Sequence, residues 1–309
     1  MRCRSDSVKR NGFSRHGKQR WRCHECGYAF VWQNDGAKYV KERTWFELWI
    51  QEGYSVRQLQ KQSHHSPAKL YRIIAYWLVH PPERTSRLNQ YRYLIFDGTY
   101  IQQRKGLVAT MDGESHDVID GLHGMTESRK PVVKYLSSLK QRGLNPVSVT
   151  LDGNPAVILA FRAIWPDITI QRCLVHVQRQ GLRWCRRYPK RTDAKHLRKL
   201  LLTLSDVDTI PKRNRFLKDF AVWEKRFGKK IENASTGGWV FSDLKKARSM
   251  LINALPDMFH YLKNPTIPSS SNGIEGYFSR LKQHYRQHRG LSVKSRTNYF
   301  QWYFKLRPR

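Results

Sequence analysis

The feature that most constrains the fold of this chain is a block of alternating strand and helix patterns in its middle third. Runs rich in β-branched and aromatic residues predict five strands, at residues 91–101, 107–111, 117–122, 147–151 and 168–171. Apolar residues at helical spacing predict two helices, at residues 130–142 and 157–164. The order β-β-β-α-β-α-β predicts a mixed sheet with helices on both faces.

That order is the order of the ribonuclease H fold, in which the first and fourth strands are neighbours. Asp97 lies inside the first strand and Asp152 directly follows the fourth, so we expect the two carboxylates side by side. Adjacent carboxylates repel unless a divalent cation lies between them, as in two-metal phosphoryl-transfer sites. The alternative is that each Asp-Gly pair is a turn dipeptide, which is what we expect of Asp112-Gly113.

The basic residues avoid this block. The chain has 57 Lys+Arg and 24 Asp+Glu, a net charge of +33. Residues 91–175 carry only +2, whereas 1–90, 176–264 and 265–309 carry +10, +13 and +8. This distribution favours a functional middle segment that contains carboxylates and is flanked by basic segments that bind nucleic-acid phosphates. The alternative is an ordinary basic protein with solvated Lys and Arg helices.

A helical stretch separates the block from one last carboxylate. Strand patterns vanish over 177–264, which predicts an all-helical insertion. A final helix then opens at Asn272, and Glu275 in its first turn is the sole acidic residue among the last 45. Glu275 is either a third cation ligand, which this helix brings back to the sheet, or the capping-box partner of Asn272.

The segment ahead of the block predicts a helix-turn-helix. Helical apolar spacing runs from Lys38 to Gly53, a short helix follows Ser55, and Ser66-Pro67 caps another. On that last helix we expect Lys69 and Arg72 to face outwards, where a recognition helix contacts base edges in the major groove. The alternative is a three-helix packing module without a ligand.

The first 26 residues contain three of the five cysteines. Cys23 and Cys26 form a C-x-x-C turn, and Cys3 stands 20 positions earlier, which favours a zinc ribbon with an incomplete first pair. A cysteine directly ahead of Met1, or His16, would supply the fourth ligand. A relic of a ribbon and a set of plain buried thiols are the alternatives.

Four motifs in order carry a family resemblance. They are Phe96-Asp97-Gly98-Thr99-Tyr100, Leu151-Asp152-Gly153-Asn154, Arg172-Cys173-Leu174-Val175-His176, and Asn272-Gly273-Ile274-Glu275-Gly276-Tyr277-Phe278-Ser279-Arg280-Leu281-Lys282. The set resembles the DDE transposases of bacterial insertion sequences related to mutator-like (MULE-type) elements. The resemblance spans nearly the whole chain, and the incomplete first C-x-x-C is its departure from the family pattern.

The resemblance implies that Asp97, Asp152 and Glu275 form the catalytic triad and hold two Mg²⁺ or Mn²⁺ ions. It also implies that Cys173 and His176 are the C-x-x-H pair ahead of the insertion. The spacing of that pair suits a metal, and a buried thiol beside a polar histidine is the equal alternative.

The function so implied is metal-dependent DNA end cleavage and strand transfer by a transposase bound to the terminal inverted repeats of its element. Double-stranded DNA is the expected partner, at element ends and target, with Arg280 and Lys282 among the phosphate contacts and at least a homodimer on DNA. A non-catalytic DNA-binding regulator, domesticated or decayed, is the alternative function, and a nuclease without strand transfer is a third.

Four parts are expected. Residues 1–34 form a zinc-ribbon-like segment, 35–88 the helix-turn-helix, 89–176 with 266–309 the ribonuclease H-like core, and 177–265 the basic helical insertion. No run approaches the ~20 apolar residues of a membrane span, and no apolar stretch of a signal peptide follows Met1. We therefore expect a cytoplasmic, nucleoid-associated bacterial protein without a membrane partner.

Overall fold

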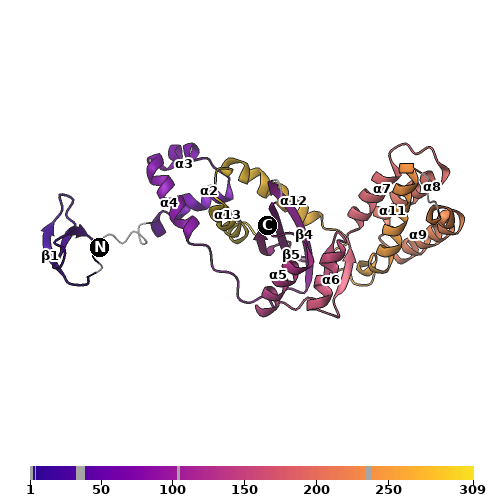
Figure 1. The fold of residues 1–309 in the computed structure, drawn as a ribbon, viewed down its shortest axis with the longest axis horizontal. Coiled ribbons are helices and arrows are strands. Elements are labelled where there is room, and N and C mark those ends of the chain that lie inside the picture. The colour runs from indigo at the N-terminus through magenta and orange to yellow at the C-terminus, as the bar shows by residue number, and fades with distance from the viewer. Residues whose placement is uncertain (1–2, 4, 33–38, 103–104, 234–237) are drawn as a thin grey trace. The chain divides into compact units, whose positions relative to one another are not determined.

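A computed structural model describes residues 3, 5–32, 39–102, 105–233 and 238–309 of the chain (Figure 1). The chain divides into two compact units. The first comprises residues 1–49 and 56–77, and the second comprises residues 50–55 and 78–309. Within the described ranges, no helix is both long enough and apolar enough to cross a membrane.

In its described part, the first unit contains a small antiparallel sheet followed by helices. Its strands are β1 (Val8–Phe13), β2 (Gln19–Cys23) and β3 (Ala29–Val31), in that spatial order. Its helices are α2 (Arg43–Gln51), α3 (Val56–Ser63) and α4 (Pro67–Val79). The helices bury the apolar residues that define their spacing, namely Phe46, Trp49, Leu59, Leu70, Ile73 and Ile74. The predicted succession of three helices is confirmed.

The start of α4 follows its local sequence. Pro67 is its first residue, where a missing N–H costs no helical hydrogen bond. The Ser66 hydroxyl accepts a hydrogen bond from the Lys69 amide at 3.4 Å, as an N-cap does.

The second unit is a mixed α/β structure built on a five-stranded sheet. Its sheet region runs β4 (Tyr93–Gln102), β5 (Lys105–Asp112), β6 (Val118–His123), α5 (Arg129–Gln141), β7 (Ser148–Leu151), α6 (Pro155–Ile164) and β8 (Thr169–Arg172). The spatial strand order is β6-β5-β4-β7-β8. Strands β6, β5 and β4 pair antiparallel, and β4, β7 and β8 pair parallel. The predicted element order, and the predicted pairing of the first strand with the fourth, are confirmed.

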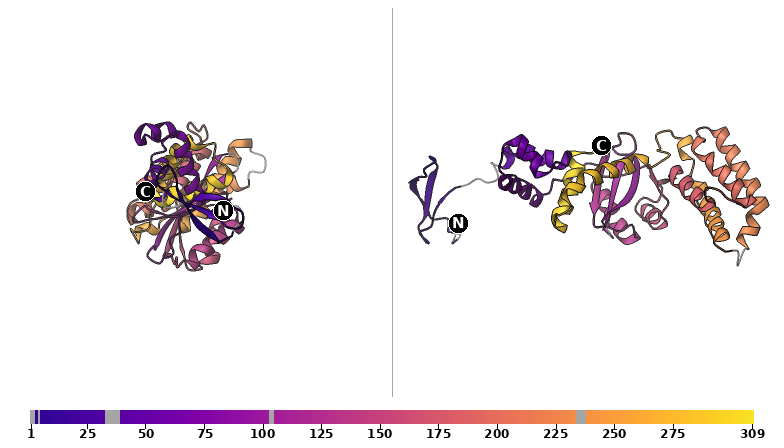
Figure 2. Two further views of the ribbon diagram at one scale, coloured as in Figure 1. Left: turned by 90° about the vertical axis from the view of Figure 1, so that its left-hand side faces the viewer. Right: turned by 90° about the horizontal axis from the view of Figure 1, so that it is seen from above.

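Helices cover both faces of the sheet (Figures 1 and 2). Leu94 and Phe96 of β4 belong to the hydrophobic core formed with α5 and α6. On the other face lie α12 (Asn272–Tyr285), which contacts β4, and α13 (Val293–Leu306), which contacts β6. Because side chains alternate along a strand, Asp97 points away from the α5–α6 core.

Between β8 and α12 the described residues form helices joined by turns and loops, without a strand. This region comprises α7 (Leu174–Cys185), α8 (Thr192–Leu202), η1 (Leu204–Asp206), α9 (Ile210–Trp223), the π-helix η2 (Glu224–Gly228), α10 (Lys229–Glu232), α11 (Gly238–Ala254), η3 (Leu255–Asp257) and η4 (His260–Leu262). These helices form a hydrophobic core of their own. The first of them begins at Leu174, ahead of residue 177, where the sequence pattern placed the start of the insertion.

Candidate active site

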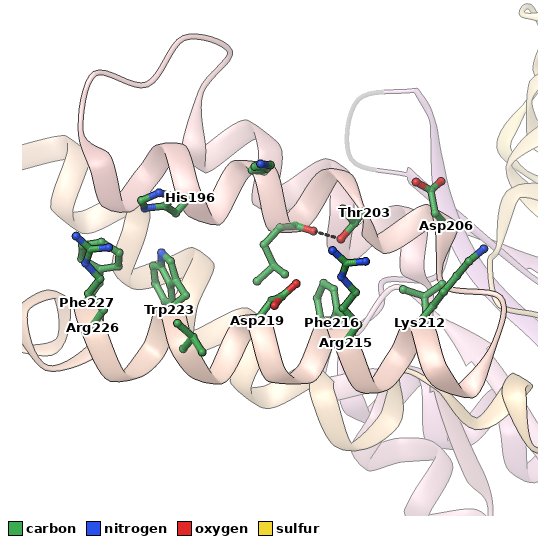
Figure 3. Close-up of a pocket in the computed structure, with 14 residues that line it drawn as sticks. His196, Thr203, Asp206, Lys212, Arg215, Phe216, Asp219, Trp223, Arg226 and Phe227 are labelled. Carbon is green, nitrogen blue, oxygen red and sulfur yellow. Dashed lines mark hydrogen bonds between the residues drawn. The ribbon is translucent and has the colours of Figure 1, made fainter.

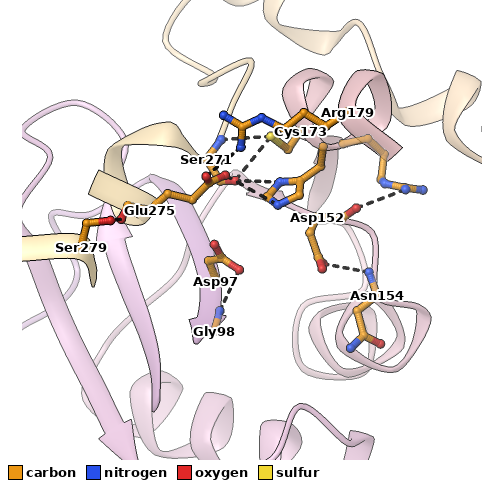
Figure 4. Close-up of polar contacts among 11 residues, drawn as sticks. Asp97, Gly98, Asp152, Asn154, Cys173, Arg179, Ser271, Glu275 and Ser279 are labelled. Carbon is orange, nitrogen blue, oxygen red and sulfur yellow. Dashed lines mark hydrogen bonds and ion pairs between the residues drawn. The ribbon is translucent and has the colours of Figure 1, made fainter. Parts of the chain in front are cut away.

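The register of β4 against β7 sets the position of the first two candidate carboxylates. Ile95 pairs with Thr150 in the parallel ladder. Continuing that register by two residues puts Asp97 level with Asp152, which directly follows β7. Both side chains line one cleft of about 470 Å³ together with Glu275 of α12 (Figure 4). The structure therefore brings together three residues that lie far apart in the sequence.

The glycine after each aspartate serves close packing. Gly98 lies inside β4, and a Cβ added there would overlap the carboxylate of Glu127. Gly153 has φ +99°, and an added Cβ would overlap the guanidinium of Arg172. Asp112, by contrast, accepts a hydrogen bond from the Ser115 amide at 2.8 Å in the β5–β6 turn. The expectation that Asp112-Gly113 is only a turn is therefore confirmed.

The electrostatics of Asp97 are unfavourable for its charged form. Burial raises the pKa of Asp97 to about 7, and the charges of Asp152 and Glu127 act in the same direction. The amide of Gly98 donates to Asp97 Oδ1 at 2.8 Å and partly opposes this rise. A cation between the carboxylates would remove the repulsion.

Glu275 is held by cationic partners. Its Oε2 accepts a hydrogen bond from Arg179 Nη1 at 2.9 Å, and its Oε1 lies 3.6 Å from His176 Nε2. Helix α12 begins at Asn272 after the N-cap residue Ser271, so Asn272 is not the cap. The capping-box alternative for Glu275 is therefore wrong, because its carboxylate turns to α7 instead of to the start of its own helix.

The C-x-x-H pair joins the start of α7 to the start of α12. The amide and hydroxyl of Ser271 lie 3.3 and 3.4 Å from Cys173 Sγ, and Ser271 Oγ lies 3.2 Å from His176 Nδ1. The hydrogen bond with Cys173 raises the pKa of His176 to about 9, and the charges of Asp97 and Glu275 contribute. Although burial opposes it, the contacts with His176 and Ser271 lower the pKa of the Cys173 thiol.

Glu127 is a cleft residue that the sequence motifs do not identify. It lies between β6 and α5 and lines the cleft beside Asp97 and Asp152. Asn154 Nδ2 donates to Glu127 Oε2 at 3.3 Å. Burial and the charge of Asp152 raise the pKa of Glu127. No local signal distinguishes this glutamate from one that caps the following helix, so only its tertiary contacts identify it.

The predicted DNA-contacting residues differ in their surroundings. Arg72 and Arg280 are exposed, as expected. Lys282 lines the cleft, where its Nζ lies 2.5 Å from Thr99 Oγ1. The expectation that Lys69 faces outwards is wrong, because its ammonium lies 2.5 Å from Glu42 Oε1 and only 26% of its side chain is exposed. This partly buried pairing with a carboxylate just ahead of α2 overrides the outward direction that helical spacing indicated.

The three N-terminal cysteines lie together. Their sulfur atoms are all within 4.8 Å of one another, the one group of potential metal ligands in the described residues that is this close. Among the described residues, no three carboxylates of the cleft therefore have oxygen atoms that all lie within 4.8 Å of one another. The amide of Cys26 lowers the pKa of Cys23 to about 7, which favours the metal-binding thiolate.

His16 is not part of this group, and the expectation that it could supply the fourth ligand is wrong. It lies in the β1–β2 turn beyond Phe13, whereas Cys23 pairs with Val8 at the other end of that hairpin. Its Nε2 accepts a hydrogen bond from Arg15 at 3.0 Å.

Comparison with known protein families finds one described as "Transposase, Mutator family", whose model matches residues 77–253. The match covers more than half of the chain. It includes Asp97, Asp152, Cys173 and His176, and ends before Glu275. No curated protein matches the chain.

Proposed function

The chain belongs to the Mutator family of transposases, and we propose that it binds the terminal inverted repeats of its own element, cleaves the DNA ends and joins them to a target. Family membership makes it a DNA-processing enzyme with DNA as its partner. Direct strand transfer requires no covalent protein intermediate. Because two ends must reach one target, the acting form is at least a dimer.

One observation carries the proposal: Asp97, Asp152 and Glu275 line a single cleft although they come from strand β4, the loop after β7 and a distant helix. Neither Asp97 nor Asp152 has an ion-pair partner within the described part of the chain. Carboxylate oxygens that form no ion pair are hard donors of the kind that suits Mg²⁺ or Mn²⁺. The strand order and the helices on both faces are those expected of a ribonuclease H-like core.

In this proposal the three carboxylates hold two divalent cations. Bound there, such ions would supply charge neutralisation at the reacting phosphate and activation of water or a 3′-OH as the nucleophile. The protein itself contributes positioning. Arg179 and His176 orient Glu275, and Lys282 brings a positive charge to the cleft wall, where a DNA phosphate would bind.

The helical insertion offers a second DNA-contacting surface. A groove of about 610 Å³ runs between α8 and α9 (Figure 3). Its floor includes the buried Phe216 and Trp223, and exposed cations line it, among them Lys199, Arg215 and Arg226. None of these three cations forms an ion pair with a described residue. Unpaired cations along a groove are a surface on which a DNA backbone can bind.

The N-terminal parts would select the repeat. We assign terminal recognition to α3 and α4, with Arg72 as the base-reading or phosphate-contacting residue of α4. The three cysteines supply a Zn²⁺ site whose fourth ligand lies outside the cluster. The proposed organisation is a zinc-ribbon-like segment at 1–34, a helix-turn-helix at 35–88, a core at 89–176 and 266–309, and an insertion at 177–265.

The deciding experiment is an assay of end cleavage and joining with purified protein, Mg²⁺ and a donor DNA carrying the element's own termini. We expect both products from the wild type and neither from Asp97→Asn, Asp152→Asn or Glu275→Gln. Asp167→Asn, which changes an exposed aspartate outside the cleft, is the matched control.

Three outcomes would change the proposal. Binding without cleavage leaves a regulator, and cleavage without joining leaves a nuclease. A fully active Asp97→Asn variant would remove the metal assignment.

A further inference from the structure

Glu127 occupies a position in the cleft that neither the three-carboxylate motif nor the family match assigns. It lies two residues before the start of α5, on the loop that follows β6. Its side chain lines the same cleft as Asp97, Asp152 and Glu275. The cleft is therefore bordered by four carboxylates instead of three.

Two contacts fix where the carboxylate of Glu127 lies. Its Oε1 occupies the space that a side chain at position 98 would fill, directly beside the backbone that follows Asp97. Its Oε2 accepts a hydrogen bond from the side-chain Nδ2 of Asn154 at 3.3 Å. The backbone N–H of Asn154 donates to Asp152 Oδ1 at 2.9 Å. The carboxylate of Glu127 is thus held beside Gly98 and Asn154, which follow the two aspartates along the chain.

The charges in the cleft are distributed unevenly. Glu275 has Arg179 and His176 as cationic partners. Asp97, Asp152 and Glu127 have no ion-pair partner among the residues that the structure describes. Three carboxylates that form no ion pair are costly to hold together, and a bound divalent cation is the ordinary compensation.

We propose that Glu127 is a fourth carboxylate ligand of the divalent cations, on the Asp97–Asp152 side of the cleft. The inference rests on the proposed function, because it needs the cleft to be a cation site. It also gives Gly98 a role: the glycine is required so that Glu127 can reach the aspartates.

The test is a Mn²⁺ titration of the full chain without DNA, with free Mn²⁺ measured by electron paramagnetic resonance. Glu127→Gln keeps the shape of the side chain and a carbonyl oxygen that can accept from Asn154, but removes the charge. We expect the affinity of the weaker Mn²⁺ site to fall about tenfold or more. Glu114→Gln, at an exposed turn residue outside the cleft, is the matched control and should bind Mn²⁺ as the wild type does.

A second variant tests the geometry independently of the charge. Gly98→Ala adds a methyl group where the Glu127 carboxylate lies, so it should displace that carboxylate and weaken the same Mn²⁺ site. In a Glu127→Ala background the space is free, and the glycine substitution should then add little further loss. This non-additivity would not arise if Gly98→Ala acted only through Asp97.

The outcomes separate this inference from the proposed function. If Asp97→Asn weakens Mn²⁺ binding while Glu127→Gln does not, the fourth ligand is overturned and the proposed function stands. If Asp97→Asn also binds Mn²⁺ as the wild type does, the cleft is not a cation site and both fail. Independent, additive losses from Gly98→Ala and Glu127→Ala would contradict the proposed contact.

Discussion

Arg179 Nη1 donates a hydrogen bond to Glu275 Oε2 at 2.9 Å and so joins helix α7 to helix α12 across 96 residues of sequence. The Arg179 side chain is 60% exposed, and exposed ion pairs contribute only about 0–1 kcal/mol to stability. The pair therefore serves to orient the Glu275 carboxylate more than to hold the fold together.

Arg179→Ala should lower the rate of end cleavage by about tenfold to a hundredfold, because a displaced ligand loses the reacting geometry. The midpoint of thermal unfolding should stay close to that of the wild type. Arg183→Ala, at an exposed position one turn further along α7, is the control and should cleave normally. Equal losses in both variants would indicate a general charge effect instead of orientation.

Asp97→Asn should stabilise the metal-free protein, since it removes a buried charge that lies beside Asp152 and Glu127. A gain of about 1 kcal/mol corresponds to roughly 2–4 °C in the midpoint of thermal unfolding. Mg²⁺ should raise the midpoint of the wild type and have a smaller effect on the variant. A variant that unfolds at a lower temperature than the metal-free wild type would contradict this account.

Zinc should copurify with the chain at about one ion per molecule, bound by Cys3, Cys23 and Cys26. Elemental analysis of Cys23→Ser should find the zinc lost or greatly reduced. Cys185→Ser, at a buried thiol of the helical insertion, should retain it. Zinc-free wild-type protein, purified without chelators, would leave the three sulfurs as plain thiols.

Lys199→Ala combined with Arg215→Ala should weaken DNA binding in a salt-dependent manner. Loss of two phosphate contacts should reduce the slope of log K against log salt by about 1.8 for duplex DNA. The control pair is Lys195→Ala with Lys218→Ala, exposed cations on the same two helices that do not line the groove. If both pairs reduce the slope equally, the groove has no special part in binding.

Lys69 and Arg72 should respond differently to substitution although they lie one turn apart on α4. Lys69→Met leaves the half-buried Glu42 without its cation and should cost about 1–3 kcal/mol of stability. Arg72→Ala should leave stability unchanged and weaken binding to the terminal repeat, by about 1–3 kcal/mol if it contacts a base. Urea unfolding measures the stability of each variant, and fluorescence anisotropy measures its affinity for the terminal repeat. A loss of stability in Arg72→Ala with none in Lys69→Met would contradict the contacts assigned to Lys69.

Local sequence patterns were enough to predict most of the framework. Alternating apolar residues and turn dipeptides predicted the strands, and Ser66-Pro67 predicted the start of α4, because these signals act within a few residues of chain. The meeting of Asp97 with Asp152 was also predictable. It follows once the element order makes β4 and β7 parallel neighbours, since a shared register then brings the two positions level.

The sequence by itself determined the element order, the helical insertion and the two aspartates, since each depends on short-range periodicity. Other features were decided only by the tertiary structure. The packing of distant segments determined that Glu127 lies against Gly98, that Arg179 holds Glu275, and that Glu42 withdraws Lys69 from the surface. The sequence pattern around a charged residue does not identify its interaction partner. Its role is therefore known only once the folded chain places a counter-charge or a cavity beside it.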